Sequence, residues 1–151
     1  MPDRSKFWCH GVDVHVQDEP NSAQQIRRNK EGTRIRQDSG SNWFHFAIPT
    51  ATQLVDRDVE IWNAYLKADI NGNATIVAVH IYMGGMPEAV RIHEVNDITW
   101  SNRHPLDETF DVSNRRLTAP IVMCIKVDFE TGGEITFAGA GAQIVGPEYG
   151  G

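Results

Sequence analysis

Three histidines of this chain lie inside apolar segments whose hydrophobic residues alternate as in β-strands: His10, His45 and His80. Neutral imidazole is a common ligand of transition metals. Because neighbouring strands lie about 4.8 Å apart, histidines on adjacent strands can share one ion. The chain has no His-x-His, His-Glu-x-x-His or Cys-x-x-Cys spacing. We therefore expect no resident metal or other cofactor, and these three histidines are the ligands to consider if a metal is bound.

Two tryptophans stand where a ligand can reach them. Trp43 is on the opposite face of its predicted strand from two phenylalanines, and Trp100 stands in a polar turn region beside Asn102 and Arg103. Tryptophan stacks on the apolar faces of sugars while neighbouring polar groups bind hydroxyls. The sequence therefore predicts a carbohydrate- or small-ligand site formed by Trp43, Trp100, Asn102 and Arg103.

The last predicted strand, residues 134–145, has small residues at its centre. Its two faces consist of Ala138, Ala140 and Ala142 on one side and Gly139 and Gly141 on the other. Glycine weakens a strand unless another backbone, a ligand or an aromatic ring must come close. A flat edge strand can also pair with a second chain. We predict an assembly surface here, with packing under tryptophans of the opposite sheet as the alternative.

The chain has no recognisable catalytic motif. It lacks the Gly-x-Ser-x-Gly elbow of hydrolases, and no predicted strand carries glutamates at the spacing of two or four that many jelly-roll glycosidases use. Cys124 lies between Met123 and Ile125, and apolar surroundings raise a thiol pKa rather than lower it. We therefore expect a non-catalytic protein.

Alternation and turn residues predict an all-β chain. The central feature is a hairpin over 59–83, with Asn71-Gly72 at its turn and the strand 74–83 in the middle of a sheet. Other strands are predicted near 7–16, 33–37, 42–48, 88–98, 109–112, 121–129 and 134–145, with a possible short helix at 23–30. Eight or nine strands favour a two-layer antiparallel β-sandwich, jelly-roll-like or immunoglobulin-like, with a closed barrel as the alternative.

Length and charge limit the possible partners. The 151 residues fit a single domain, 1–151, with short polar termini. A net charge of -6 argues against a general nucleic-acid or anionic-membrane binder, and we interpret the basic cluster within 24–36 as a solvated loop and strand edge. The polar start has no signal-peptide segment, so the cytoplasm is the default location, with secretion not excluded.

Two short motifs carry a family resemblance. They are Trp8-Cys9-His10-Gly11 near the start and Phe137-Ala138-Gly139-Ala140-Gly141-Ala142 near the end. In these motifs the chain resembles small bacterial β-sandwich proteins of uncharacterised function. The resemblance implies the fold and no particular activity.

Three hypotheses for function follow. The leading one is a non-catalytic β-sandwich that self-associates as a structural subunit, a homo-oligomer. The alternative is a carbohydrate- or small-ligand-binding module that uses Trp43 or Trp100. The third is an enzyme whose metal is held by histidines among His10, His45, His80 and His93.

Overall fold

The computed structural model describes residues 2–17, 25–50, 53–54, 57–84 and 88–148. Within these residues the chain forms strands, turns and one short 3-10 helix. The elements are β1 (Pro2–His10), η1 (Gly11–Asp13), β2 (His15–Val16), β3 (Gln25–Asn29), β4 (Gly32–Gln37), β5 (Ser41–Ile48), β6 (Gln53–Leu54), β7 (Arg57–Asp58), β8 (Glu60–Ile70), β9 (Ala74–Met83), β10 (Val90–Val95), β11 (Arg103–Arg116), β12 (Ile121–Phe129) and β13 (Gly133–Glu148).

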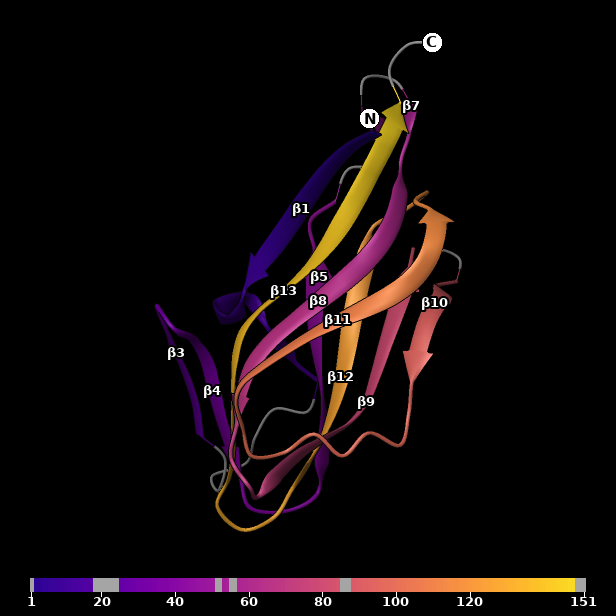
Figure 1. Cartoon of the computed structure of the whole chain (residues 1–151). Coiled ribbons are helices and arrows are strands. Elements are labelled where there is room, and N and C mark those ends of the chain that lie inside the picture. Colours follow the sequence, from indigo (N-terminus) through magenta and orange to yellow (C-terminus); the bar gives the residue numbers. More distant parts are fainter. Residues whose placement is uncertain (1, 18–24, 51–52, 55–56, 85–87, 149–151) are drawn as a thin grey trace.

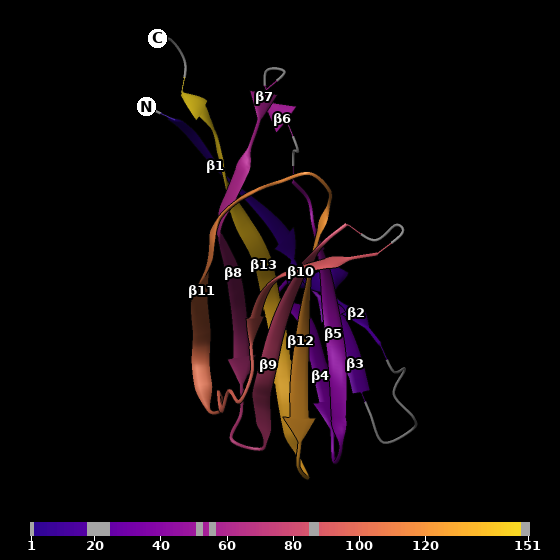
Figure 2. The ribbon, with the colours of Figure 1, turned by 90° about the vertical axis from the view of Figure 1, so that its right-hand side faces the viewer.

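Two antiparallel sheets face each other, as Figures 1 and 2 show. Sheet A has six strands in the order β11-β8-β13-β4-β3, and β1 pairs with β13 beyond the part that pairs with β4. Sheet B has five strands in the order β10-β9-β12-β5-β2. The predicted two-layer antiparallel sandwich is confirmed, and the barrel alternative is not what forms. Within the described residues, no helix is long and apolar enough to span a membrane.

The predicted hairpin over 59–83 is wrong in its pairing. β8 bonds to β11 and β13 in sheet A, whereas β9 bonds to β10 and β12 in sheet B. The Asn71-Gly72 turn therefore carries the chain from one layer to the other. Asn71 also bonds this turn to the connection from β12 to β13, which crosses between the same two sheets. Its Nδ2 donates to the carbonyl oxygen of Gly132 over 2.8 Å, and its Oδ1 accepts from the amide of Glu134 over 3.1 Å.

The predicted strand 7–16 is not continuous, and part of it turns a different face to the core than predicted. It breaks at η1, after which the chain crosses to β2 in sheet B. In β1 it is Cys9 that is buried, while Trp8 is 41% exposed. The break occurs where Gly11 packs against β13: a Cβ on Gly11 would lie only 1.7 Å from the carbonyl oxygen of Phe137. The chain must therefore turn away at this point.

Four of the other predicted strands are confirmed, one is longer than predicted, and the possible helix is a strand over 25–29. The strands at 33–37, 42–48, 121–129 and 134–145 are confirmed as β4, β5, β12 and β13. The possible helix at 23–30 is wrong for 25–29, which form β3, and its first two residues lie outside the described residues. The strand at 109–112 is the centre of the much longer β11.

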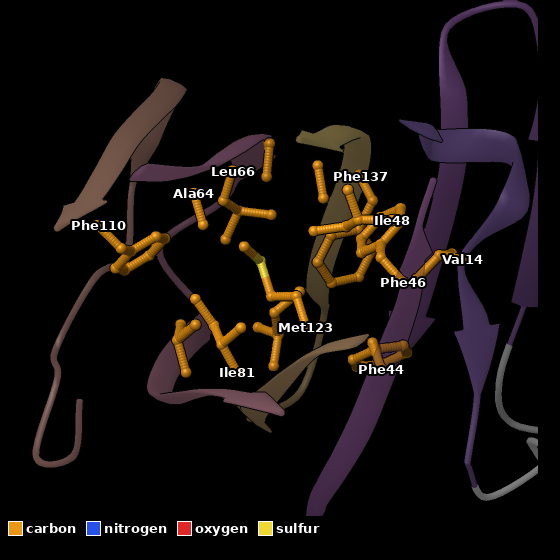
Figure 3. Close-up of a cluster of buried hydrophobic side chains, with 14 of the residues drawn as sticks. Val14, Phe44, Phe46, Ile48, Ala64, Leu66, Ile81, Phe110, Met123 and Phe137 are labelled. Atoms are coloured by element: carbon orange, nitrogen blue, oxygen red, sulfur yellow. The ribbon is translucent and has the colours of Figure 1, made fainter. Parts of the chain in front are cut away.

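The core lies between the sheets and is rich in aromatic rings (Figure 3). Phe44, Phe46 and Phe137 are fully buried, and the Phe137 ring centroid lies 5.1 Å from that of Phe44 and 5.7 Å from that of Phe46. Because β5 and β13 belong to opposite sheets, these contacts join the layers. Burial of Phe44 and Phe46 on the inner face of β5 leaves the alternate residues of that strand on the outer face.

Candidate functional site

The outer face of sheet B carries Trp43. Its neighbours in sequence, Asn42 and Phe44, are buried, and Trp43 itself is half-buried on the outside. The register places Lys126 of β12 between Trp43 of β5 and Ala78 of β9. A shift of register follows directly after Lys126, where Val127 pairs with Ile76 and Val77 is the extra residue of β9. Such a bulge bends the strand and re-aims the side chains beside it.

A groove of about 660 Å³ opens on this face. One side is the segment 96–99, which is held against β9 by a hydrogen bond of 3.0 Å from the Ile98 amide to the Val77 carbonyl. The other side is formed by Trp43 and β12. The lining residues are Trp43, Val77, Ala78, His80, Asn96, Asp97, Ile98, Thr99, Lys126 and Asp128.

The groove combines an aromatic surface with hydrogen-bonding groups. The ring centroids of Trp43 and His80 lie 5.2 Å apart at an angle of 51°, and His80 Nε2 lies 2.8 Å from Asn96 Oδ1. Among the ion pairs of the described residues, none engages Lys126 or Asp128. An ammonium, a carboxylate and an amide thus line the same groove as the indole ring, which is a set suited to a ligand with hydroxyl groups.

The other predicted ligand residues lie elsewhere. Trp100 packs on Phe110 with ring centroids 6.0 Å apart, and its backbone bridges to Ile76 of β9. The Arg103 guanidinium covers the Trp100 ring at 5.7 Å and bonds Glu108 at 2.7 Å. Trp100 is therefore a packing residue at the junction of the sheets, and of the four predicted ligand residues only Trp43 lines the groove.

The three predicted metal-ligand histidines divide between the two sheets. His10 ends β1 in sheet A, where its Nε2 lies 3.0 Å from the Lys30 carbonyl oxygen and its Nδ1 accepts from the Val12 amide. His45 and His80 lie in sheet B. Across the described residues, no three His, Cys, Asp or Glu side chains converge as a ready-made metal site. His10 cannot join the other two, because it is in the opposite layer.

His45 has a different neighbour that the sequence analysis did not pair with it. Its Nδ1 lies 3.0 Å from Cys124 Sγ, and its Nε2 lies 2.9 Å from Gln17 Oε1. Burial lowers the pKa of His45, with a smaller contribution from His15, and burial raises the pKa of the Cys124 thiol to about 11. The thiol therefore keeps its proton at neutral pH, which agrees with the expectation from its apolar neighbours.

Sheet A presents a second aromatic surface on its outer face, which the sequence analysis missed. Trp8 stacks on Tyr65 with centroids 5.4 Å apart and an angle of 23°. The two residues belong to β1 and β8, and the register places Gly141 of β13 between them. Lys67 and Lys6 lie over the Trp8 and Tyr65 rings at 5.0 and 4.9 Å. Gly141 was the available signal, since an aromatic ring was one of the groups expected to approach it.

The predicted assembly segment is an interior strand. β13 pairs with β8 on one side and with β4 and β1 on the other, so it has no free edge along 138–142. Ala140 and Ala142 are fully buried in the core, and Trp8 covers Gly141. The glycines therefore make room for a ring of the same chain, and the edge-pairing argument for this segment is wrong.

Comparisons with known proteins place this arrangement among β-sandwiches. One similar solved structure is the xylan-binding module CBM15, with a TM-score of 0.54 and 9% identity over 98% of this chain and all of that one. Another is the low affinity xylan binding module CBM86 from the gut symbiont Roseburia intestinalis, with a TM-score of 0.55 and 8% identity over 91% and 94% of the two chains. At these identities the likeness concerns the fold. No curated protein sequence matches the chain. A family model does match, over residues 1–142, and the chain belongs to that family, a family of unknown function (DUF6623).

Proposed function

We propose that this protein is a non-catalytic carbohydrate-binding protein and that its groove on sheet B holds a segment of a glycan chain. The observation that carries the proposal is the position of Trp43 on the wall of a 660 Å³ groove that also contains Asn96, Lys126 and Asp128. The fold supports it, because two structural neighbours are xylan-binding modules. This is the alternative drawn from the sequence, and it now has more support than self-association.

Each side chain has a definite part in binding. The indole of Trp43 stacks on the apolar face of a sugar ring, where C–H groups meet the negative face of the π-system. Lys126 donates to hydroxyl oxygens, Asp128 accepts from hydroxyl protons, and the Asn96 amide does both. The volume lies within the range of roughly 300–1,000 Å³ that is usual for ligand sites. His80 supports the wall by its contacts with Trp43 and Asn96.

The test is a binding measurement on soluble polysaccharides. Xylan is the first choice, followed by other neutral glycans, with affinity electrophoresis for screening and calorimetry for affinity. We expect at least one glycan to bind, and Trp43→Ala to weaken binding by roughly five- to twelvefold. Loss of one aromatic stack of roughly 1–1.5 kcal/mol corresponds to that range.

Trp8→Ala is the matched control. It removes the same side chain from the other sheet, where Trp8 is 41% exposed, and it should leave glycan affinity unchanged. No binding to any glycan in the panel would overturn the proposed function. Binding that is lost in Trp8→Ala and kept in Trp43→Ala would instead move the site to sheet A.

Self-association stays a prediction. In the described residues the outermost strands are β1, β3 and β11 in sheet A and β10 and β2 in sheet B. Any pairing of sheets between two chains would use these edges rather than β13. Light scattering over a concentration series measures it directly, and a mass of 16.9 kDa at every concentration would exclude the homo-oligomer.

A further inference from the structure

A row of five potentially metal-binding side chains crosses the whole width of sheet B. His15 pairs with His45, His45 pairs with Cys124, Cys124 pairs with His80, and His80 pairs with Glu94. The five residues belong to β2, β5, β12, β9 and β10, the strands of sheet B in spatial order. Residues directly opposite each other on adjacent strands have Cβ atoms about 4.5–5.5 Å apart on one face of the sheet.

At the centre of this row, two ligand atoms already meet. Cys124 Sγ and His45 Nδ1 lie 3.0 Å apart, and His45 Nε2 faces the carbonyl oxygen of the Gln17 side chain at 2.9 Å. An amide oxygen only accepts, so Nε2 carries the ring proton and Nδ1 presents its lone pair to the thiol. Metal-binding histidines usually donate their other ring N–H to such a partner, which fixes the tautomer and the orientation of the ring.

The distances leave room for an ion after a small adjustment. A tetrahedral zinc ion lies about 2.3 Å from sulfur and 2.0–2.1 Å from nitrogen, which separates the two ligand atoms by roughly 3.5 Å. The Sγ to Nδ1 distance of 3.0 Å must therefore widen by about half an ångström. A change of side-chain torsion at His45 or Cys124 is enough for this, and the strands need not move.

His80 supplies the third ligand from the other side of Cys124. It is the register partner of Cys124 on β9 and is half-buried, with its Nε2 bonded to Asn96. To reach the ion it rotates away from Asn96. Glu94 lies beyond His80 in the row, 4.0 Å from its Nε2, but its carboxylate is paired with Arg91 at 2.8 Å, so a water molecule completes the four ligands.

We propose that Cys124, His45 and His80 bind one divalent transition-metal ion of the zinc type on the outer face of sheet B. The ion takes the place of the proton between Cys124 Sγ and His45 Nδ1. The S–H bond breaks, the metal–sulfur bond forms, and the proton leaves to solvent. Two of the three ligands, His45 and His80, are histidines that the sequence analysis named as possible metal ligands. Cys124 replaces His10 as the third ligand. His80 also lines the glycan groove, whereas Cys124 and His45 do not, so variants of Cys124 and His45 test the metal site separately from the glycan proposal.

Cobalt is the probe for the first experiment, performed on the folded, metal-free protein with its thiols reduced. Titration with Co²⁺ should give one equivalent bound, with the near-ultraviolet absorption of a cobalt–thiolate bond and the visible bands of a tetrahedral ion. Zn²⁺ should then displace the cobalt and abolish both signals. The absorption of the native chain reports the metal–sulfur bond without any variant, so a variant that fails to fold does not prevent the test.

Substitutions identify the ligands. Cys124→Ser should remove the near-ultraviolet band and weaken Co²⁺ binding at least tenfold, and His45→Gln and His80→Gln should each weaken it at least tenfold. His10→Gln is the matched control, since it changes the same residue type on the opposite sheet and should bind as the native protein does. No stoichiometric binding by the native chain, or an unchanged cobalt spectrum in Cys124→Ser, would overturn the proposal.

Discussion

The stacking of Trp8 on Tyr65 over Gly141 predicts that a side chain at position 141 lowers the free energy of unfolding. A Cβ at position 141 would lie 2.7 Å from the Phe7 carbonyl oxygen and 2.8 Å from Cδ2 of the Trp8 ring. Ordinary contacts begin near 3.4 Å, so the ring must move by roughly 0.6 Å and the Phe7 backbone must yield as well. The substitution Gly141→Ala therefore disturbs both the aromatic stack and the pairing of β1 with β13.

The magnitude follows from these two losses. Disrupting the Trp8–Tyr65 stack costs about 0.5–1.5 kcal/mol, and weakening a hydrogen bond of the ladder costs about 1 kcal/mol. Replacing glycine by alanine returns about 0.4–1 kcal/mol by restricting the unfolded chain. We expect Gly141→Ala to lower the free energy of unfolding by about 0.5–2 kcal/mol, which is roughly 1–8 °C in Tm for a chain of this size.

Urea unfolding followed by circular dichroism measures this effect without relying on tryptophan fluorescence. Two other glycines provide the controls. A Cβ on Gly139 meets only the Cys9 carbonyl oxygen at 3.0 Å and Trp8 at 3.8 Å, and a Cβ on Gly72 meets nothing within 4 Å. The expected order of destabilisation is Gly141, then Gly139, then Gly72. A Gly141→Ala protein as stable as Gly72→Ala would refute the proposed packing.

Three further predictions concern the core and two titratable groups. Phe137→Ala should lower the free energy of unfolding by about 3–5 kcal/mol in urea, because its fully buried ring joins the two sheets. Burial lowers the pKa of His93 below 6.5, against an opposing effect of Asp111. The unfolded state therefore binds the proton more readily, and unfolding titrations should show stability falling as the pH drops from 7 through about 6.5, with a flatter profile in His93→Gln. Burial first and Asp13 second raise the pKa of Cys9, so peptide mapping after iodoacetamide treatment at pH 8 should show slower Cys9 labelling than in urea and faster labelling in Asp13→Asn. Equal rates in the native and Asp13→Asn proteins would contradict the assigned role of Asp13.

The local pattern was sufficient to predict the fold class and most strands. Alternation over 42–48 correctly placed Phe44 and Phe46 inside and Trp43 and His45 outside, because the period of a strand is two residues and one face must be buried. It also placed Trp43 where a ligand can reach it. The same rule failed for Trp8, since Cys9 and not the larger tryptophan faces the core. Where both faces of a strand carry apolar residues, alternation alone does not tell which face is buried.

Which strands pair is a long-range property. Asn71-Gly72 signals a reversal of the chain, and the same turn serves a hairpin within one sheet or a crossing between two. Here the inner faces of β8 and β9 pack against each other through the core, and each strand takes its hydrogen bonds from partners distant in sequence. The glycines of β13 indicated that a ring, a ligand or a backbone comes close, but not that the ring belongs to Trp8, more than 120 positions earlier.

By itself, the sequence determined that this chain is a β-sandwich with Trp43, His45 and His80 on strands, because hydrophobic alternation and turn residues act over a few neighbouring positions. Tertiary structure alone decided which side chains meet. It joined Trp43 to the segment 96–99 in a groove, separated Trp100 and His10 from it, and set Cys124 between His45 and His80. The physical reason is register, since the face on which a side chain lies follows from its own strand, whereas its neighbours follow from strands that may be anywhere in the chain.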